Sequence, residues 1–393
     1  MNEFNTQRLL KSIIIAILIV VIIRTTWIGD DIKITIRTVL NTLNGFGATF
    51  NTDERVQAYT HPLWFLLIVI TTFLIQNVYI AIFFLSVVCT VTMMWLLIRD
   101  SEKLTDFLIP IILLFSKAFV DYLTSGLENP LTHLLLVWGI LRLIKDIESE
   151  NIGLRPMTLI ILGSVYLSRP DSILLVLPLV FYSIFIYRNQ FQFSLKFLIS
   201  QLSWLILPAA IWTLFSLIYY GFPFPTTAYA KLSHGENSHT IALQGIYYFI
   251  DSLNRDPLTL LTIGFGIFIG WQKNGWYRWV SVGLLLHSVY LIYIGGDFMT
   301  GRFLTPSVVV SILLLANLLK DSIQQLIVSL PIIFIGLFSI NMTLLADPSI
   351  TDFKPDNNGL VDERIWYFHN ESLVHSHRDL FKQPKWQKSK KQI

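Results

Sequence analysis

The stretch LKSIIIAILIVVIIRTTWIGDDIKITIRTVLNTL, residues 10–43, joins an apolar run to an amphipathic one through two adjacent carboxylates. The run 10–28 is long enough to cross a bilayer as a helix, and we expect a retained membrane helix there. Beyond the carboxylates, apolar side chains recur mostly every three or four residues, at Ile32, Ile36, Val39, Leu40 and Leu43. That spacing predicts an amphipathic helix over 31–43 that lies along the membrane surface.

The composition of the whole chain extends this interpretation. Of 393 residues, 53% are hydrophobic and only 14% are charged, which is too little polar surface to cover a soluble globule of this size. Spanning runs must be helical, because lipid offers no partner for backbone groups. We therefore expect an all-α integral membrane protein with about 11 transmembrane helices, within a range of about 10 to 12. The apolar segments are 10–28, 62–75, 79–98, 106–120, 129–145, 157–168, 173–187, 197–220, 256–271, 278–294, 306–320 and 325–345.

The charges restrict topology and partners. Short loops rich in Lys and Arg are expected to stay in the cytoplasm. The remaining connections are then expected to face outward: the loops 29–61, 121–128, 168–172, 221–240 and 295–305, and the tail from 346. This arrangement predicts a multi-pass protein of the inner or plasma membrane, with a membrane domain 1–345 and a short extracytoplasmic tail 346–393. The 14-residue segment 62–75 is the weakest span and is expected to be partial or re-entrant. A net charge of +3 is too small to indicate nucleic acid.

Asp30 and Asp31 stand where the first membrane helix ends and the amphipathic helix begins. One interpretation is that they cap the second helix and balance its dipole. The other is a functional site, because two carboxylates at the exit of a membrane span are costly through desolvation and mutual repulsion. The residues alone leave both interpretations open.

Other outward loops carry charges of both signs beside Gly and Pro. Carboxylates there could take a proton from a hydroxyl or hold a metal, and cations could hold a phosphate. This inventory suits sugar transfer from a lipid phosphate, which needs a base for the acceptor and positive charge for the departing phosphate. A solvated loop charge is expected for Asp121, whereas His133 and His287 lie in apolar runs and are expected to be core residues. The candidate residues are Glu128, Arg169, Asp171, Tyr229, Lys231, Asp297 and Arg302.

Several segments resemble a known family. GDDIKITIRTVLNTLNGFGATFNTDERVQAYTHPLW (29–64) is similar to a segment of GT-C fold, multispanning glycosyltransferases akin to the mycobacterial terminal β-arabinofuranosyltransferases. Further similar segments follow in the family's order: TSGLENPL (124–131), SRPDS (168–172), PTTAYAKL (225–232), GGDFMTGRFLTP (295–306) and GLVDERIWYF (359–368). The resemblance therefore covers most of the chain.

The resemblance implies a transferase that uses a polyprenyl-phosphate sugar on the extracytoplasmic side, usually with inversion. An acidic residue of the first outward loop is the general base in such enzymes, which maps here to Asp30 or Asp31. The implied acceptor is an envelope glycan, lipopolysaccharide or protein. No cofactor is identified, and a divalent metal, with Asp30, Asp31 or Glu128 as ligand, is left open. Residues expected to shape the loop or approach donor and acceptor are Arg37, Glu54, Arg55, Glu128, Arg169, Tyr229, Lys231, Asp297 and Arg302.

Two other classes of protein remain as alternatives. A transporter or flippase of envelope lipids would place ionisable or broken-helix sites near the membrane midplane, but the charges here lie at segment ends. A membrane O-acyltransferase would use an embedded histidine as base, and His133 or His287 could serve.

Overall fold

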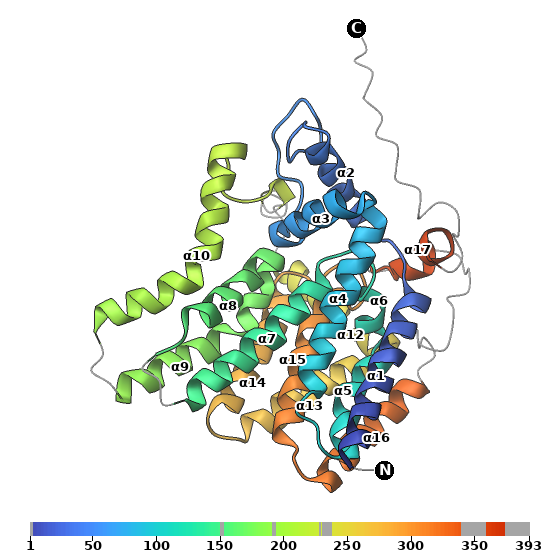
Figure 1. Ribbon diagram of the computed structural model, residues 1–393, viewed down its shortest axis with the longest axis vertical. Coiled ribbons are helices and arrows are strands. Elements are labelled where there is room, and N and C mark those ends of the chain that lie inside the picture. Colours follow the sequence, from blue (N-terminus) through green and yellow to red (C-terminus); the bar gives the residue numbers. More distant parts are fainter. Residues whose placement is uncertain are drawn as a thin grey trace.

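The computed structural model describes residues 3–149, 153–190, 194–227, 229, 238–338 and 359–373. These residues form helices and no sheet, with two isolated β-bridges, Trp27–Ser372 and Met299–Val361. Figure 1 shows the helices gathered into one bundle. In chain order they are α1 (Glu3–Thr25), α2 (Asp31–Leu43), α3 (Pro62–Ile75), α4 (Val78–Ile98), η1 (Leu104–Phe107), α5 (Leu108–Phe115), α6 (Lys117–Tyr122), α7 (Asn129–Glu148), α8 (Pro156–Ser168), η2 (Pro170–Leu175), α9 (Leu177–Gln190), α10 (Leu195–Tyr220), α12 (Ser238–Arg255), α13 (Pro257–Trp271), α14 (Trp276–Tyr293), η3 (Arg302–Leu304), α15 (Thr305–Leu318), α16 (Ser322–Leu337) and α17 (Glu363–Glu371).

The apolar side chains face both inward and outward. Helix α15 runs through the core, where Val308, Val309, Val310 and the residues that follow have almost no exposed surface. On the outside, α10 leaves Ile211 61% and Ile218 77% exposed. A soluble protein would not expose such an apolar surface to water, whereas a membrane protein can expose it to lipid. The described part of the chain is therefore an all-α membrane protein.

Four described segments are long and apolar enough to cross a membrane, judged by length and composition: Thr6–Thr25, Val78–Ile98, Pro170–Tyr187 and Leu195–Tyr220. The predicted total of about 11 crossings stays a prediction. Helix α3 has 14 residues, as expected for the weak segment 62–75. The single segment predicted over 106–120 is instead broken at Ser116, whose hydroxyl accepts a hydrogen bond from the amide of Phe119 and begins a new helix.

The candidate residues lie at one end of the bundle. Helix α2 has the predicted bounds, Asp31–Leu43, and in Figure 1 it lies with α17 at the end opposite the N-terminus of α1. Helix α10 is bent in the same view, and it contains Pro208, a residue type that kinks helices because it lacks the backbone N–H. It packs closely on α8, because a Cβ added to Gly163 would lie 2.0 Å from the carbonyl oxygen of Leu205.

Candidate active site

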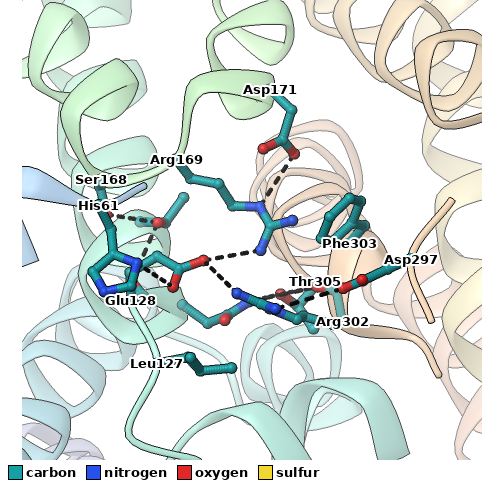
Figure 2. Close-up of polar contacts among 12 residues, drawn as sticks. His61, Leu127, Glu128, Ser168, Arg169, Asp171, Asp297, Arg302, Phe303 and Thr305 are labelled. Carbon is teal, nitrogen blue, oxygen red and sulfur yellow. Dashed lines mark hydrogen bonds and ion pairs between the residues drawn. The ribbon is translucent and has the colours of Figure 1, made fainter. Parts of the chain in front are cut away.

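Glu128 is the centre of a buried cluster of charges. It stands at the N-cap of α7 and is 2% exposed. Arg169 and Arg302 approach the same carboxylate oxygen, Oε1, at 3.1 and 3.4 Å, and Figure 2 shows the two guanidinium groups converging on it. The other oxygen, Oε2, lies 3.3 Å from Nδ1 of His61 without hydrogen-bond alignment. Four segments that are distant in sequence thus meet at one carboxylate.

The protonation states in the cluster follow from its neighbours. Burial raises the pKa of Glu128, but Arg302, His61 and Arg169 outweigh burial and bring the pKa down to about 2. Burial is the main reason that the pKa of His61 is lowered. At neutral pH the cluster therefore holds an ionised Glu128, a neutral His61 and two guanidinium cations.

Arg302 connects this cluster to the first loop. Its Nη1 lies 3.2 Å from Oδ2 of Asp31 and 3.7 Å from Oδ2 of Asp297. The preceding Gly301 has φ +73°, and a Cβ there would lie 2.9 Å from the Cβ of Ala118, so this sharp turn needs glycine. The Asp31 side chain is 41% exposed whereas that of Arg302 is 9% exposed. An accessible carboxylate is thus fixed beside a buried cation.

On its other side the cluster reaches into the bundle. Arg169 also binds Asp171, with 3.1 Å between Nε and Oδ2, and Asp171 lies 3.1 Å from Nε2 of His287. Nδ1 of His287 is 2.8 Å from the hydroxyl of Ser307. His133 similarly contacts the hydroxyl of Thr305 at 3.0 Å. Both histidines have no exposed surface and are core residues as expected, so neither is placed to serve as an accessible acyl-transfer base.

Asp30 and Asp31 have different surroundings. Asp30 occupies the N-cap position of α2, yet its side chain makes no capping hydrogen bond, so the predicted cap is not formed. Asp30 is exposed, while Asp31 is held by Arg302. This contact distinguishes Asp31 from Asp30, which the sequence alone does not do.

The other candidates of the first loop, Arg37, Glu54 and Arg55, make their contacts outside the cluster. Arg37 contacts Asn51 at 3.4 Å and covers the ring of Phe50, Glu54 accepts a hydrogen bond from Asn51, and Arg55 lies over the ring of Tyr219. These contacts shape the loop itself, away from Glu128.

Two further candidates belong to the loop after α10. Tyr229 is 40% exposed and packs near Phe222 and Phe224. Lys231 lies outside the described residues. Their predicted part in donor binding stays a prediction.

The chain is similar to two curated proteins. It is 26% identical over 414 aligned residues to the "Terminal beta-(1->2)-arabinofuranosyltransferase" of Mycobacterium tuberculosis (strain ATCC 25618 / H37Rv), covering 89% of this chain and 63% of that protein. It is 27% identical over 334 residues to the protein of the same name from Corynebacterium glutamicum, covering 71% of this chain and 46% of that protein. The chain is a distant relative of these transferases. It spans about two thirds or less of their length.

No protein-family model matches the chain, and no solved structure matches it. The resemblance inferred from the sequence segments is nevertheless confirmed by the two transferases. The motifs that carry it supply most of the cluster: Glu128 from TSGLENPL, Arg169 and Asp171 from SRPDS, and Asp297 and Arg302 from GGDFMTGRFLTP.

Sequence reasoning missed two residues of this region and misjudged a third. His61 and Glu363 were not singled out, although the run DER at 362–364 is an unusual charge cluster before an aromatic helix. The expectation for Asp121 was wrong: it is 4% exposed and pairs with Lys117 and Arg364. A buried lysine supplies the countercharge that a solvated loop would not need.

The metal prediction remains open. Among the residues that the structure describes, no group of three or more His, Cys, Asp or Glu is arranged to hold a metal ion. Asp31 and Glu128 are instead bridged by the guanidinium of Arg302. Arginine can hold a phosphate through paired hydrogen bonds, so this cluster could bind an anionic group by itself.

Proposed function

We propose that this protein is a glycosyltransferase that moves a sugar from a polyprenyl-phosphate donor to an envelope glycan, lipopolysaccharide or protein acceptor, at the extracytoplasmic face and with inversion. The observation that carries this proposal is the contact between Asp31 and Arg302. It places an accessible carboxylate, able to accept a proton, 3.2 Å from a cation able to hold a phosphate. The distant kinship with arabinofuranosyltransferases supports a pentose as the first sugar to test.

In the proposed reaction, Asp31 takes the proton of the acceptor hydroxyl while the acceptor oxygen attacks the anomeric carbon. The bond from that carbon to the phosphate oxygen breaks, and the polyprenyl phosphate leaves with the bonding electrons. Arg302 stabilises the charge that develops on the departing phosphate. Glu128 and Asp297 hold the guanidinium in place, since both carboxylates approach it.

The donor's lipid tail has no assigned place. An apolar pocket of about 70 Å³ lies behind the first loop, lined by Thr26, Ile28, Tyr79, Phe83 and Leu373 among others. Ligand pockets usually have several hundred Å³, so this one is too small for a polyprenyl chain. We propose that the tail instead stays in the bilayer along the apolar exterior.

The decisive experiment offers the purified protein a panel of polyprenyl-phosphate sugars, pentoses first, with glycan, lipopolysaccharide and peptide acceptors. Parallel samples with and without a chelator test the open question of a divalent metal, and mass spectrometry detects the product. Asp31→Asn should lower the rate by about 100-fold or more, because general-base catalysis is lost. Asp30→Asn is the matched control and should have a smaller effect. Undiminished transfer by the Asp31 variant would overturn the assigned base.

A further inference from the structure

The C-terminal segment 360–373 is fixed between two loops of the site. At its start, the amide of Val361 donates to the carbonyl of Phe298 at 2.8 Å, and the amide of Thr300 donates to the carbonyl of Val361 at 3.0 Å. At its end, the amide of Ile28 donates to the carbonyl of Glu371 at 3.1 Å. Helix α17 is therefore tied to the loop of Asp297 and to the residues just before Asp30.

This attachment buries the carboxyl group of Glu363 beside the first loop. Glu363 is 5% exposed, and its Oε2 has no hydrogen-bond partner among the residues that the structure describes. A Cβ built on Gly29 would lie 3.5 Å from that oxygen, so the carboxyl group touches the residue that precedes the aspartate pair. The site thus contains an acidic side chain that the proposed reaction has not used.

The groups around Glu363 are mostly acidic. Several charged or titratable groups lie close enough to interact with it electrostatically: Asp30 and Asp31 at the start of α2, Asp297 and Arg302 in the loop before α15, Tyr122 of α6 and Tyr367 of its own helix. The one cation among them, Arg302, already binds Asp31 and Glu128 and approaches Asp297.

Two further basic residues, one on helix α17 and one beside it, are also paired with carboxylates. Lys117 pairs with Asp121 and Asp362, and Arg364 with Asp121. A buried carboxylate without a cation of its own is costly. Burial, followed by Asp31, raises the pKa of Glu363 to about 8, so this carboxyl group is uncharged at neutral pH.

We propose that Glu363 is a positioning residue of the reaction site: its buried carboxyl group completes the wall beside Gly29, next to the aspartate pair, and a negative charge at that place would repel an anionic lipid-phosphate donor. The proposal rests on the proposed function, because it requires a negatively charged donor next to Arg302. It makes the C-terminal segment a part of the site.

The test measures the KM for the polyprenyl-phosphate sugar between about pH 6 and 9.5. This range includes the raised pKa of Glu363. In the unaltered protein, KM should rise at least about fivefold from about pH 7 to 9, because one added carboxylate faces the donor. In Glu363→Gln, which keeps the shape and removes the titration, KM should stay level. Glu371→Gln is the matched control from the same helix, where the carboxyl group is partly exposed and paired with Lys33, and it should keep the rise.

A level KM in the unaltered protein, or an equal rise in Glu363→Gln, would overturn the proposal. Infrared spectra of the unaltered protein, with ¹³C-labelled glutamate, provide a second readout. This readout requires neither sugar transfer nor a variant that folds. A protonated-carboxyl band at pH 7 that disappears through about pH 8 supports an uncharged Glu363, and its absence contradicts it. If no donor is turned over, the proposed function fails while the infrared result still decides the charge. If sugar is transferred with a pH-independent KM, only this inference fails.

Discussion

Glu128 and Glu363 are the same side chain at nearly the same burial, 2% and 5% exposed, and both contribute to one site. Glu128 faces two guanidinium groups, and its pKa is brought down to about 2. Glu363 faces the carboxylates of the first loop, and burial together with Asp31 raises its pKa to about 8. Burial raises the pKa of both, so the charged neighbours alone decide which glutamate is ionised.

Glu128 and Glu363 also differ in what they do in the site. Glu128 holds Arg169 and Arg302 in place and so fixes the geometry of the cluster, as Figure 2 shows. In the described part of the chain, Oε2 of Glu363 has no hydrogen-bond partner, and the role proposed for this side chain depends on its being uncharged. A pair of titratable groups pushed apart in pKa by their surroundings is common where proteins carry out proton chemistry.

The largest expected effect is on stability. Glu128→Ala leaves two buried guanidinium groups without their shared anion and should lower the free energy of unfolding by about 3–5 kcal/mol. Glu363→Ala removes a carboxyl group without a cation of its own and should cost only about 1–2 kcal/mol. Thermal unfolding of both variants in detergent would measure the difference. Equal losses of unfolding free energy would contradict the difference described above, in which Glu128 is paired with cations and Glu363 is uncharged.

A smaller effect is expected on the pH dependence of stability, with opposite signs. The pKa of Glu128 in the folded protein is about 2, below the ordinary glutamate value of 4.5, so its contribution to stability is present above about pH 4.5 and lost as pH falls to about 2. The pKa of Glu363 is about 8, above the same ordinary value, so its contribution is fully present below about pH 4.5 and lost as pH rises through about 8.

The measurement is the difference in unfolding free energy between the unaltered protein and each Gln variant, across that range. The difference for Glu128→Gln should shrink on acidification and that for Glu363→Gln on alkalinisation, each by a few kcal/mol at most. Two differences that change in the same direction would refute the assigned protonation states.

Much of this site could be predicted because its residues lie in short polar segments beside apolar runs. The periodicity of 31–43 gave a helix with the observed bounds. The charges of both signs at helix ends identified Glu128, Arg169, Asp297 and Arg302, which the structure brings together. Charge and hydropathy patterns are local properties, so they find residues at the ends of membrane segments.

The rest depends on contacts between distant parts of the chain. Glu363 belongs to the predicted tail 346–393, and contacts between distant residues bring it into the site: Val361 pairs with Phe298 and Thr300, and Glu371 with Ile28. The burial of Asp121 likewise depends on Arg364, more than two hundred residues further along. The division into a membrane domain and a tail stays a prediction, but described residues of that tail pack against the first loop.

The smallest expected effect concerns the edge of the same C-terminal helix. Lys33 and Glu371 lie 3.1 Å apart with side chains 39% and 28% exposed. Lys33→Ala should cost at most about 1 kcal/mol, and added salt should reduce the loss further, because water and ions screen an exposed pair. Unfolding measured at low and high salt tests this. A loss as large as that of Glu128→Ala would mean that the exposed ion pair is the main attachment of α17 to the first loop. A small loss would leave the backbone bonds at Val361 and Ile28 as the attachment that keeps Glu363 buried.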